Sequence, residues 1–271
     1  MMNDRRNSDS PVVPAKPANN GGGQSAAPPA EQVEGRGLAK GNVSEQPKSR
    51  AQIRNDLQQA LNRVRQAAVR DREMQFTTLW HHVYNTDRLR EAYFSLKRDA
   101  APGVDDETWQ AYGEQLESNL RDVSARLRRG AYRAKPVRRV FIPKPDGRQR
   151  PLGIPTVKDR IVQTATLLIL EPIFEADFLD SSFGYRPGRS AQQAVAAVQQ
   201  HLAGGLREVY DADLQGYFDT IPHDQLLKCL EMRIADRRVL TLIRMWLQAP
   251  IEERDDQGQQ KTTKPEQGTP Q

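Results

Sequence analysis

The sequence predicts an α+β fold that is helix-rich, with short antiparallel strands and a disordered N-terminal tail. Three observations lead to this prediction. Apolar residues recur three or four positions apart in most of the chain after residue 48, as they do in amphipathic helices. Two short runs within residues 137–154 flank a turn, as the strands of a hairpin do. Residues 1–48 are rich in Pro, Gly and Asn and show no apolar periodicity, so they cannot bury enough surface to offset the entropy of ordering.

The composition suits one or two soluble domains and permits a polyanionic partner. The chain has 271 residues, of which 37% are hydrophobic and 28% are charged, and its net charge is +5. Such a basic balance permits binding to RNA or DNA without requiring it. No apolar run approaches the roughly 20 residues that span a membrane, and the N-terminus lacks the apolar core of a signal peptide. We therefore expect a cytoplasmic protein with no membrane partner.

Residues 49–72 are expected to form the first helix. Apolar residues recur along it at helical spacing, and arginines crowd the remaining surface. This basic surface is either an ordinary solvated face or a face that lies along an RNA backbone. In the second case, Arg54 and Arg63 would neutralise phosphates and displace counterions.

A second helical region is expected at about 76–98. Its adjacent His81 and His82 point about 100° apart on a helix, so we interpret them as packing or surface residues and not as ligands of one metal ion. A turn follows, and either Asp105 or Asp106 is expected to cap the next helix.

Residues 137–154 are expected to form a β-hairpin, with strands at Val137–Ile142 and Arg148–Ile154. Lys144 and Arg150 flank its turn. Two cations at a tight hairpin form a good clamp for a triphosphate, because Lys supplies a point charge and Arg a bidentate fork. A solvent-exposed basic hairpin with no ligand is the alternative.

A long helix at about 156–179, capped by Thr156, is apolar over a wide face and is therefore expected at the centre of its domain. The turn at 181–190 then presents two cations before another helix. Arg186 and Arg189 are expected to contact phosphate or template, or else to form ordinary salt bridges that stabilise the turn.

The most informative stretch begins as a predicted strand at 208–215, where Asp211 and Asp213 share one face. Asp is a poor strand former, so two of them on one strand need a reason. A hard cation such as Mg²⁺ is one, since it prefers carboxylate oxygens on a rigid element. Solvated carboxylates at the rim of a strand are the alternative. Tyr217 and Phe218 place two large rings just beyond the carboxylates.

The rest of the chain is expected to add two helices and a hairpin. Asp219 or Thr220 is expected to cap a helix at about 223–233, and the single cysteine, Cys229, is expected to be a core thiol in that helix. A further helix, at 236–249, and a polar hairpin, at 251–264, complete the chain. Two aspartates at the hairpin tip are not interpreted as a catalytic pair, because no apolar strand flanks them; they are Asp255 and Asp256.

Five strings stand in the order found in the reverse transcriptases encoded by group II introns, and the chain resembles that family. They are A-A-P-G-V-D-D-E-T-W at 100–109, the hairpin V-F-I-P-K-P-D-G-R-Q-R-P-L-G-I-P at 140–155, S-S-F-G-Y-R-P-G-R-S at 181–190, D-A-D-L-Q-G-Y-F-D-T-I-P-H-D within 208–224 and G-T-P-Q from residue 268.

The resemblance implies a right-hand polymerase fold, with an N-terminal helical extension at 49–98, fingers at 99–203 and a partial palm at 204–271. It also implies an RNA-directed DNA polymerase, a nucleotidyltransferase of a mobile element, with a maturase role in intron splicing. The partners implied are intron RNA, an RNA template with a DNA primer, and dNTPs, and a homodimer is left open.

The resemblance further implies roles for single residues. Asp213 corresponds to the first catalytic carboxylate, which binds two Mg²⁺ ions, and the backbone carbonyl of Leu214 corresponds to a ligand of one of them. Phe218 takes the place of the aromatic residue that packs under the sugar and excludes a 2′-hydroxyl. Three residues match positions at the incoming nucleotide, namely Lys144, Arg150 and Gln271.

One departure from the family pattern concerns activity. The sequence contains no Tyr-x-Asp-Asp motif, which supplies the other two metal-binding carboxylates of the family. We therefore expect these 271 residues alone to be an inactive N-terminal fragment, with a reading frame that is truncated within the fifth motif and a strand at 208–215 that lacks neighbours. A non-catalytic RNA-binding protein or remnant is one alternative function. A retron, CRISPR-associated or diversity-generating reverse transcriptase is another.

Overall fold

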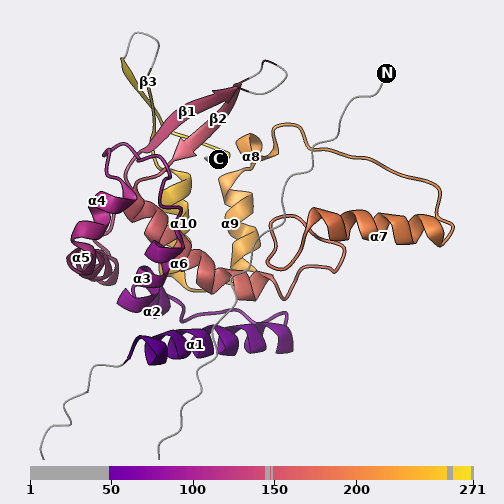
Figure 1. Cartoon of the computed structure of the whole chain (residues 1–271), viewed down its shortest axis with the longest axis horizontal. Coiled ribbons are helices and arrows are strands. Elements are labelled where there is room, and N and C mark those ends of the chain that lie inside the picture. Colours follow the sequence, from indigo (N-terminus) through magenta and orange to yellow (C-terminus); the bar gives the residue numbers. More distant parts are fainter. Residues whose placement is uncertain (1–48, 144–146, 148, 255–258, 270–271) are drawn as a thin grey trace, which may run out of the picture. The chain divides into compact units, whose positions relative to one another are not determined.

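The computed structural model describes residues 49–143, 147, 149–254 and 259–269, and Figure 1 shows their arrangement. Helices dominate, and a four-stranded sheet accompanies them. The helix-rich α+β prediction is confirmed, whereas the tail at 1–48 lies outside the described residues. The elements are α1 (Arg50–Arg70), α2 (Trp80–Val83), α3 (Thr86–Ser95), α4 (Trp109–Glu114), α5 (Leu116–Arg129), β1 (Val137–Pro143), β2 (Gln149–Ile154), α6 (Val157–Phe174), α7 (Ala191–Ala203), α8 (Tyr217–Thr220), α9 (His223–Glu231), α10 (Arg237–Leu247), β3 (Ile251–Arg254) and β4 (Gln260–Thr263).

Short polar side chains cap the N-termini of several of these helices. The Ser49 hydroxyl accepts a hydrogen bond from the backbone N–H of Gln52, whose side chain bonds back to Ser49, and this capping box begins α1. Ser190 begins α7 in the same way. Thr156 caps α6 as predicted, because its Oγ1 accepts from the N–H of Asp159 at 3.2 Å. Each cap satisfies N–H groups that have no partner inside the helix.

The predicted cap at Asp105 or Asp106 is wrong. α4 begins immediately after Thr108, and the Thr108 hydroxyl caps it. Asp105 and Asp106 lie too early in the chain to reach the first N–H groups of α4. Their carboxylates instead form ion pairs with Lys135 at 3.0 Å and Arg138 at 2.5 Å, just before and within β1.

The helical region expected at 76–98 is split in two. α2 is a single turn. The Asn85 side chain then accepts hydrogen bonds from two backbone N–H groups and caps the N-terminus of α3. His81 is exposed and His82 is partly buried, which agrees with their interpretation as surface and packing residues. Burial and the nearby positive groups lower the pKa of His82 to about 4.

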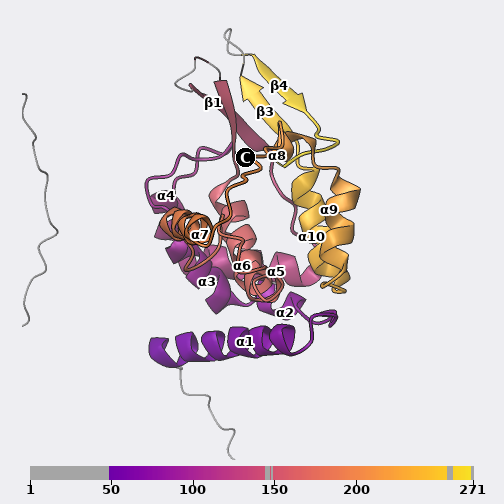
Figure 2. The same ribbon diagram turned by 90° about the vertical axis from the view of Figure 1, so that its right-hand side faces the viewer.

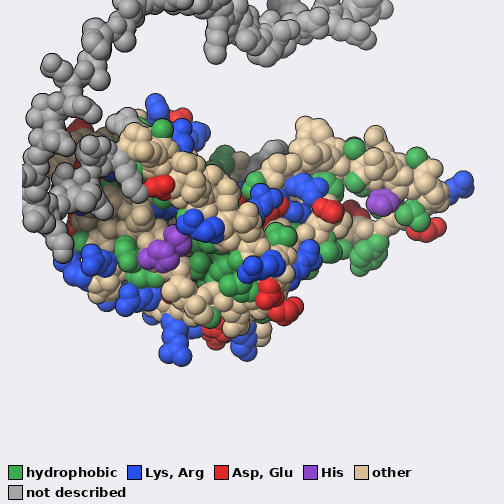
Figure 3. Space-filling view, turned by 90° about the horizontal axis from the view of Figure 1, so that it is seen from below, with side chains coloured by type: hydrophobic (Ala, Val, Ile, Leu, Met, Phe, Trp, Pro, Cys, Tyr) green, Lys and Arg blue, Asp and Glu red, His purple; other side chains and the backbone are tan. Residues whose placement is uncertain are grey.

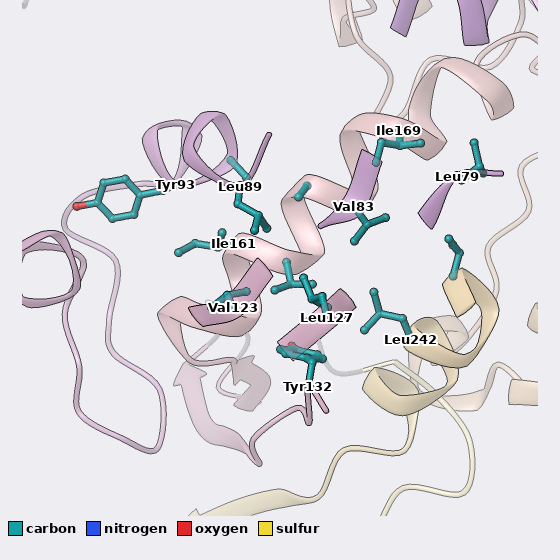
Figure 4. Packing of buried hydrophobic residues seen from close by; sticks show 14 of the residues in the cluster. Leu79, Val83, Leu89, Tyr93, Val123, Leu127, Tyr132, Ile161, Ile169 and Leu242 are labelled. Atoms are coloured by element: carbon teal, nitrogen blue, oxygen red, sulfur yellow. The ribbon is translucent and has the colours of Figure 1, made fainter. Parts of the chain in front are cut away.

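α6 is the central helix of the core, as its wide apolar face predicts. Figure 2 shows α6 among the other helices, and α1, α2 and α3 pack against it. In Figure 4, Leu89, Val123 and Leu242 lie around it although they come from α3, α5 and α10. Both Ile161 and Ile169 are at most 1% exposed. One core therefore joins segments that are far apart in the sequence.

The sheet combines two hairpins in the strand order β2-β1-β3-β4. Both hairpins are antiparallel, as predicted, but β1 and β3 pair in parallel, with Val137 beside Ile251. The sheet is therefore mixed and not wholly antiparallel. The junction is reinforced by the backbone N–H of Val137, which donates to the carbonyl oxygen of Pro250 at 2.7 Å.

Three predictions around the motif at 208–224 are wrong. No strand forms over 208–215: residues 206–214 have no regular structure and are all exposed. A strand needs a neighbour for its backbone groups, and the described part of the chain provides none here. Asp219 and Thr220 do not cap α9, because they lie within the one-turn helix α8. Cys229 is exposed, because α9 buries Leu227 and a residue two positions further points away from that side.

Residues 233–236 connect the last helices to the first. The buried Arg233 guanidinium donates to the carbonyl oxygen of Ala68 at the end of α1. Phe76 forms a parallel bridge with Ile234. The Asp236 carboxylate caps α10 and also accepts from backbone N–H groups at the start of α2. Among the described residues, none of the helices is both long and apolar enough to cross a membrane.

Candidate functional site

A hollow of about 640 Å³ is lined by two segments of the chain. One is the end of the β1–β2 hairpin near its turn, and the other is the motif at 208–224. Arg150 and Pro151 contribute from β2, and the other lining residues come from 212–219. Four residues for which the sequence predicts a role at the nucleotide or metal are therefore together, namely Arg150, Asp213, Leu214 and Phe218. More than 60 positions separate Arg150 from Asp213 in the sequence, so folding alone brings them to the same hollow.

A left-handed glycine and a single helical turn shape the wall of this hollow. Gly216 has φ of 59°, a backbone region that favours glycine, and it turns the extended segment into α8. The Thr220 hydroxyl donates to the carbonyl oxygen of Gly216 at 3.0 Å and closes the turn. The rings of Tyr217 and Phe218 then stand edge to face, with centroids 5.4 Å apart. Both rings remain substantially exposed at the hollow.

The carboxylates at the hollow can serve as part of a cation site. Asp213 and Asp219 both line it, and both residues are exposed. Carboxylate oxygens are the donors that a hard cation such as Mg²⁺ prefers. However, the described residues contain no group of three His, Cys, Asp or Glu side chains that could hold a metal ion. Asp213 therefore fits as one ligand, and the described residues do not complete the set.

Residues 267–269 lie against the turn that follows α8. The N–H of Thr269 donates to the carbonyl oxygen of Phe218 at 2.7 Å, and the N–H of Gly268 donates to that of Ile221 at 2.8 Å. The start of the G-T-P-Q string is thus fixed beside a ring that lines the hollow. Gln271 itself lies outside the described residues, as does Lys144 at the hairpin turn. The two aspartates rejected as a catalytic pair also lie outside them; they are Asp255 and Asp256.

Arg186 and Arg189 do not line the hollow and are engaged in contacts of their own turn. The Arg186 side chain is 5% exposed, and its guanidinium pairs with Glu175 at 2.6 Å. It also donates to two backbone carbonyl oxygens, and its hydrogen bond and charge hold the pKa of the Glu175 carboxyl below its usual range. Arg189 pairs with Asp180 at 2.8 Å and lies over the ring of Phe183. These contacts match the turn-stabilising alternative.

Arg54 and Arg63 lie on α1, on a different part of the molecule from the hollow, and both are exposed. Figure 3 shows the molecule from the side on which α1 lies in Figure 1, and Lys and Arg side chains are spread over that face. Three further exposed arginines follow on α1 or just after it; they are Arg65, Arg70 and Arg72. The amphipathic pattern with a basic outer surface is therefore present.

Sequence reasoning gave no role to His223, which the structure places beside Gly268. His223 is 7% exposed, and its Nε2 lies 2.7 Å from the carbonyl oxygen of Gly268. The two residues are 45 positions apart, so no local pattern indicates the contact. The available signal was the P-H-D string itself, in which a histidine follows a proline at the end of the motif.

Comparisons with known proteins find similar sequences over a large part of this chain. A model of the family "Reverse transcriptase (RNA-dependent DNA polymerase)" matches residues 142–271. Protein YkfC of Escherichia coli K12 is 39% identical over 183 residues, which cover 65% of this chain and 48% of YkfC. The group II intron-encoded protein LtrA of Lactococcus lactis is 34% identical over 178 residues, which cover 64% of this chain and 29% of LtrA. The nuclear intron maturase 1 of Arabidopsis thaliana mitochondria is 37% identical over 89 residues, 33% of this chain and 12% of the maturase.

The matched region begins within the hairpin and contains the whole hollow, so the similarity covers the residues that line it. The chain spans about half the length of YkfC and less than a third of LtrA. Residues 142–271 are thus similar to reverse transcriptases, and the chain is similar to proteins encoded by group II introns and to an intron maturase.

Proposed function

We propose that this chain forms the fingers and the first part of the palm of an RNA-directed DNA polymerase that also assists intron splicing. The N-terminal helical extension corresponds to residues 49–98, the fingers to 99–203 and the partial palm to 204–271. The observation that supports the proposal is the shared hollow, because a cation of the hairpin and a carboxylate of the motif line it together. A nucleoside triphosphate has the complementary chemistry, with a polyanionic end and an apolar sugar face.

In this proposal the triphosphate lies at the hairpin, where Lys144 and Arg150 bind its oxygens. Asp213 and the carbonyl oxygen of Leu214 are ligands of Mg²⁺, which supplies charge neutralisation at the phosphates when bound. Phe218 packs under the sugar and excludes a 2′-hydroxyl, and its half-exposed ring at the hollow supports this role. Gln271 contacts the nucleotide from the end of the G-T-P-Q string.

The proposed RNA partners are the intron and an RNA template paired with a DNA primer. Arg54 and Arg63 on the exposed face of α1 neutralise phosphates of the intron RNA. Arg186 and Arg189 are weaker candidates for RNA contact, because carboxylates and backbone carbonyl oxygens already occupy much of their donor capacity. A contact to RNA at these positions would have to compete with the ion pairs to Glu175 and Asp180.

Binding of a fluorescent dNTP in the presence of Mg²⁺ tests the proposal directly on the 271-residue chain. Arg150→Ala should weaken binding by roughly tenfold to a hundredfold, since charged hydrogen bonds contribute about 1.5–3 kcal/mol. Arg126→Ala is the matched control. It also removes one arginine, but Arg126 pairs with Asp122 on α5 and does not line the hollow.

Asp213→Asn and Asp211→Asn form a second matched pair, because only Asp213 lines the hollow. Asp213→Asn should abolish the part of the affinity that depends on Mg²⁺, whereas Asp211→Asn should leave it within about twofold of the wild type. Equal affinities for all four variants and the wild type would contradict the proposal. Tight RNA binding without any nucleotide binding would support the non-catalytic RNA-binding function instead.

A further inference from the structure

The hydrogen bond between the His223 Nε2 atom and the Gly268 carbonyl oxygen is buried. His223 is the first residue of α9, its ring is buried, and its Nε2 lies 2.7 Å from the Gly268 carbonyl oxygen. A carbonyl oxygen can only accept, so the Nε2 atom must carry the hydrogen. Inside the protein this bond does not compete with solvent, and loss of the donor would leave a buried oxygen without its partner.

A side chain at position 268 would be strained. The φ of Gly268 is +80°, and an added Cβ would lie 2.6 Å from the carbonyl oxygen and 2.8 Å from the carbonyl carbon of Asp219. Both atoms belong to the backbone of α8, which cannot move aside like a flexible side chain. The backbone of Gly268 therefore lies in direct contact with α8, the helical turn that contains Phe218.

Backbone contacts and one side chain hold the segment in place. Gln267 forms an antiparallel bridge with Pro222, and the N–H groups of Gly268 and Thr269 donate to the turn. The carbonyl oxygen of Gly268 is held from the other side, by the imidazole of His223. In the described part of the chain, His223 is therefore the side chain that fixes the direction of this peptide group.

We propose that His223 is a positioning residue of the nucleotide site: its Nε2–H holds the Gly268 carbonyl and so fixes residues 267–269 beside Phe218. The inference rests on the proposed function, because that function places the nucleotide at Phe218 and Gln271. Without the imidazole, the segment 267–269, whose Thr269 N–H donates to the carbonyl oxygen of Phe218, is held less firmly behind this ring at the wall of the hollow.

Two variants and two measurements test this role. His223→Ala removes the donor, whereas His223→Gln keeps an N–H donor on a side chain of similar length. We expect His223→Ala to lower the hydrogen-exchange protection of the Gly268 and Thr269 amides roughly tenfold and to weaken binding of Mg²⁺-dNTP roughly tenfold. His223→Gln should restore most of both. His201→Ala, which removes an exposed histidine at the end of α7, is the control and should change neither.

A double-mutant cycle separates positioning from general destabilisation. Gly268→Ala breaks the same contact from the other side, through its backbone clash with Asp219. If His223 acts only through Gly268, the double variant His223→Ala/Gly268→Ala should bind the nucleotide no more weakly than Gly268→Ala alone. Fully additive losses would overturn the proposal.

The remaining outcomes are also decisive. Unchanged protection of the two amides in His223→Ala would overturn the positioning role, and so would a lower unfolding temperature with unchanged nucleotide affinity. A wild-type chain that binds no nucleotide would overturn the proposed function. In that case the exchange measurement, which needs no nucleotide, would still decide whether His223 fixes residues 267–269.

Discussion

The Oδ2 atom of Asp236 accepts a hydrogen bond from the backbone N–H of Leu79 at 2.8 Å, across 157 positions of sequence. The same oxygen accepts from Trp80 at 2.8 Å, while Oδ1 accepts from Arg238 at 3.0 Å. A single buried carboxylate therefore caps α2 and α10 at once, and the positive ends of two helices share one negative charge.

Replacing Asp236 by alanine should lower the free energy of unfolding by about 2–4 kcal/mol, because two helix caps are lost and N–H groups are left buried. Urea denaturation of the purified chain measures this. Asp224→Ala is the control, since the Asp224 side chain is 82% exposed and its ion pair with Arg244 is 3.6 Å long. That variant should stay within about 0.5 kcal/mol of the wild type. A similar small loss for Asp236→Ala would show that the shared cap contributes little.

Gly103→Ala should also destabilise the fold. A Cβ at Gly103 would lie 2.6 Å from the Cα and 2.7 Å from the backbone nitrogen of Thr156, at the start of the central helix α6. Neither atom can move without shifting the helix, so we expect a loss of about 1–3 kcal/mol. Gly184→Ala meets no atom within 4 Å and should be nearly neutral. Thermal unfolding of both variants distinguishes a backbone clash from an ordinary glycine substitution.

The partly buried His82 should make the stability of the chain depend on pH. Its pKa in the folded protein is about 4, below the usual 6.5, chiefly because burial disfavours the charged ring. Its contribution to stability is therefore present above pH 6.5 and is lost as the pH falls towards 4. Urea denaturation at pH 7.5 and 5 should show a smaller fall in stability for His82→Gln than for the wild type. His201→Gln should fall as the wild type does; identical falls in all three would refute the assignment to His82.

Primer extension with the 271-residue chain should give no product above background. Asp213 and Asp219, the two carboxylates that line the hollow, are too few to hold two cations together, since the mutual repulsion of the cations needs several negative ligands to offset it. The assay uses an RNA template, a DNA primer, Mg²⁺ and dNTPs, with a retroviral reverse transcriptase as the positive control. Product from the purified chain that disappears in Asp213→Asn would contradict this expectation. It would mean that the chain completes the cation site with other groups.

The sequence predicted best those features that depend on local signals. The cap at Thr156, the hairpin at 137–154 and the central position of α6 follow from turn chemistry and apolar periodicity within a few residues. The strand at 208–215 could not be judged in this way, because alternation shows only which residues share a face. Whether a strand forms depends on a neighbour that the described part of the chain does not provide there.

The sequence predicts the two parts of the candidate site, the hairpin and the motif at 208–224, separately. Arg150 and Asp213 stand in recognisable strings, and the fold brings those strings to one hollow. The contact of His223 with Gly268 was missed because it joins residues 45 positions apart through one ring nitrogen. Cys229 was misplaced for a related reason. Its helix buries Leu227 and partly buries Leu226 and Leu230, whereas the thiol lies outside this buried side.

The shared cap at Asp236 has a consequence for the order of events during synthesis. A ribosome adds about 5–20 residues per second, so roughly 8–30 s pass between the synthesis of Leu79 and that of the carboxylate that completes its helix. Arg233 and Ile234, which close on α1 and Phe76, arrive at almost the same moment. The central helix α6 is made earlier and can already pack against α1, α2 and α3, but the cap of α2 and the contacts of Arg233 and Ile234 stay incomplete until this moment. During this interval a chaperone has the most to protect.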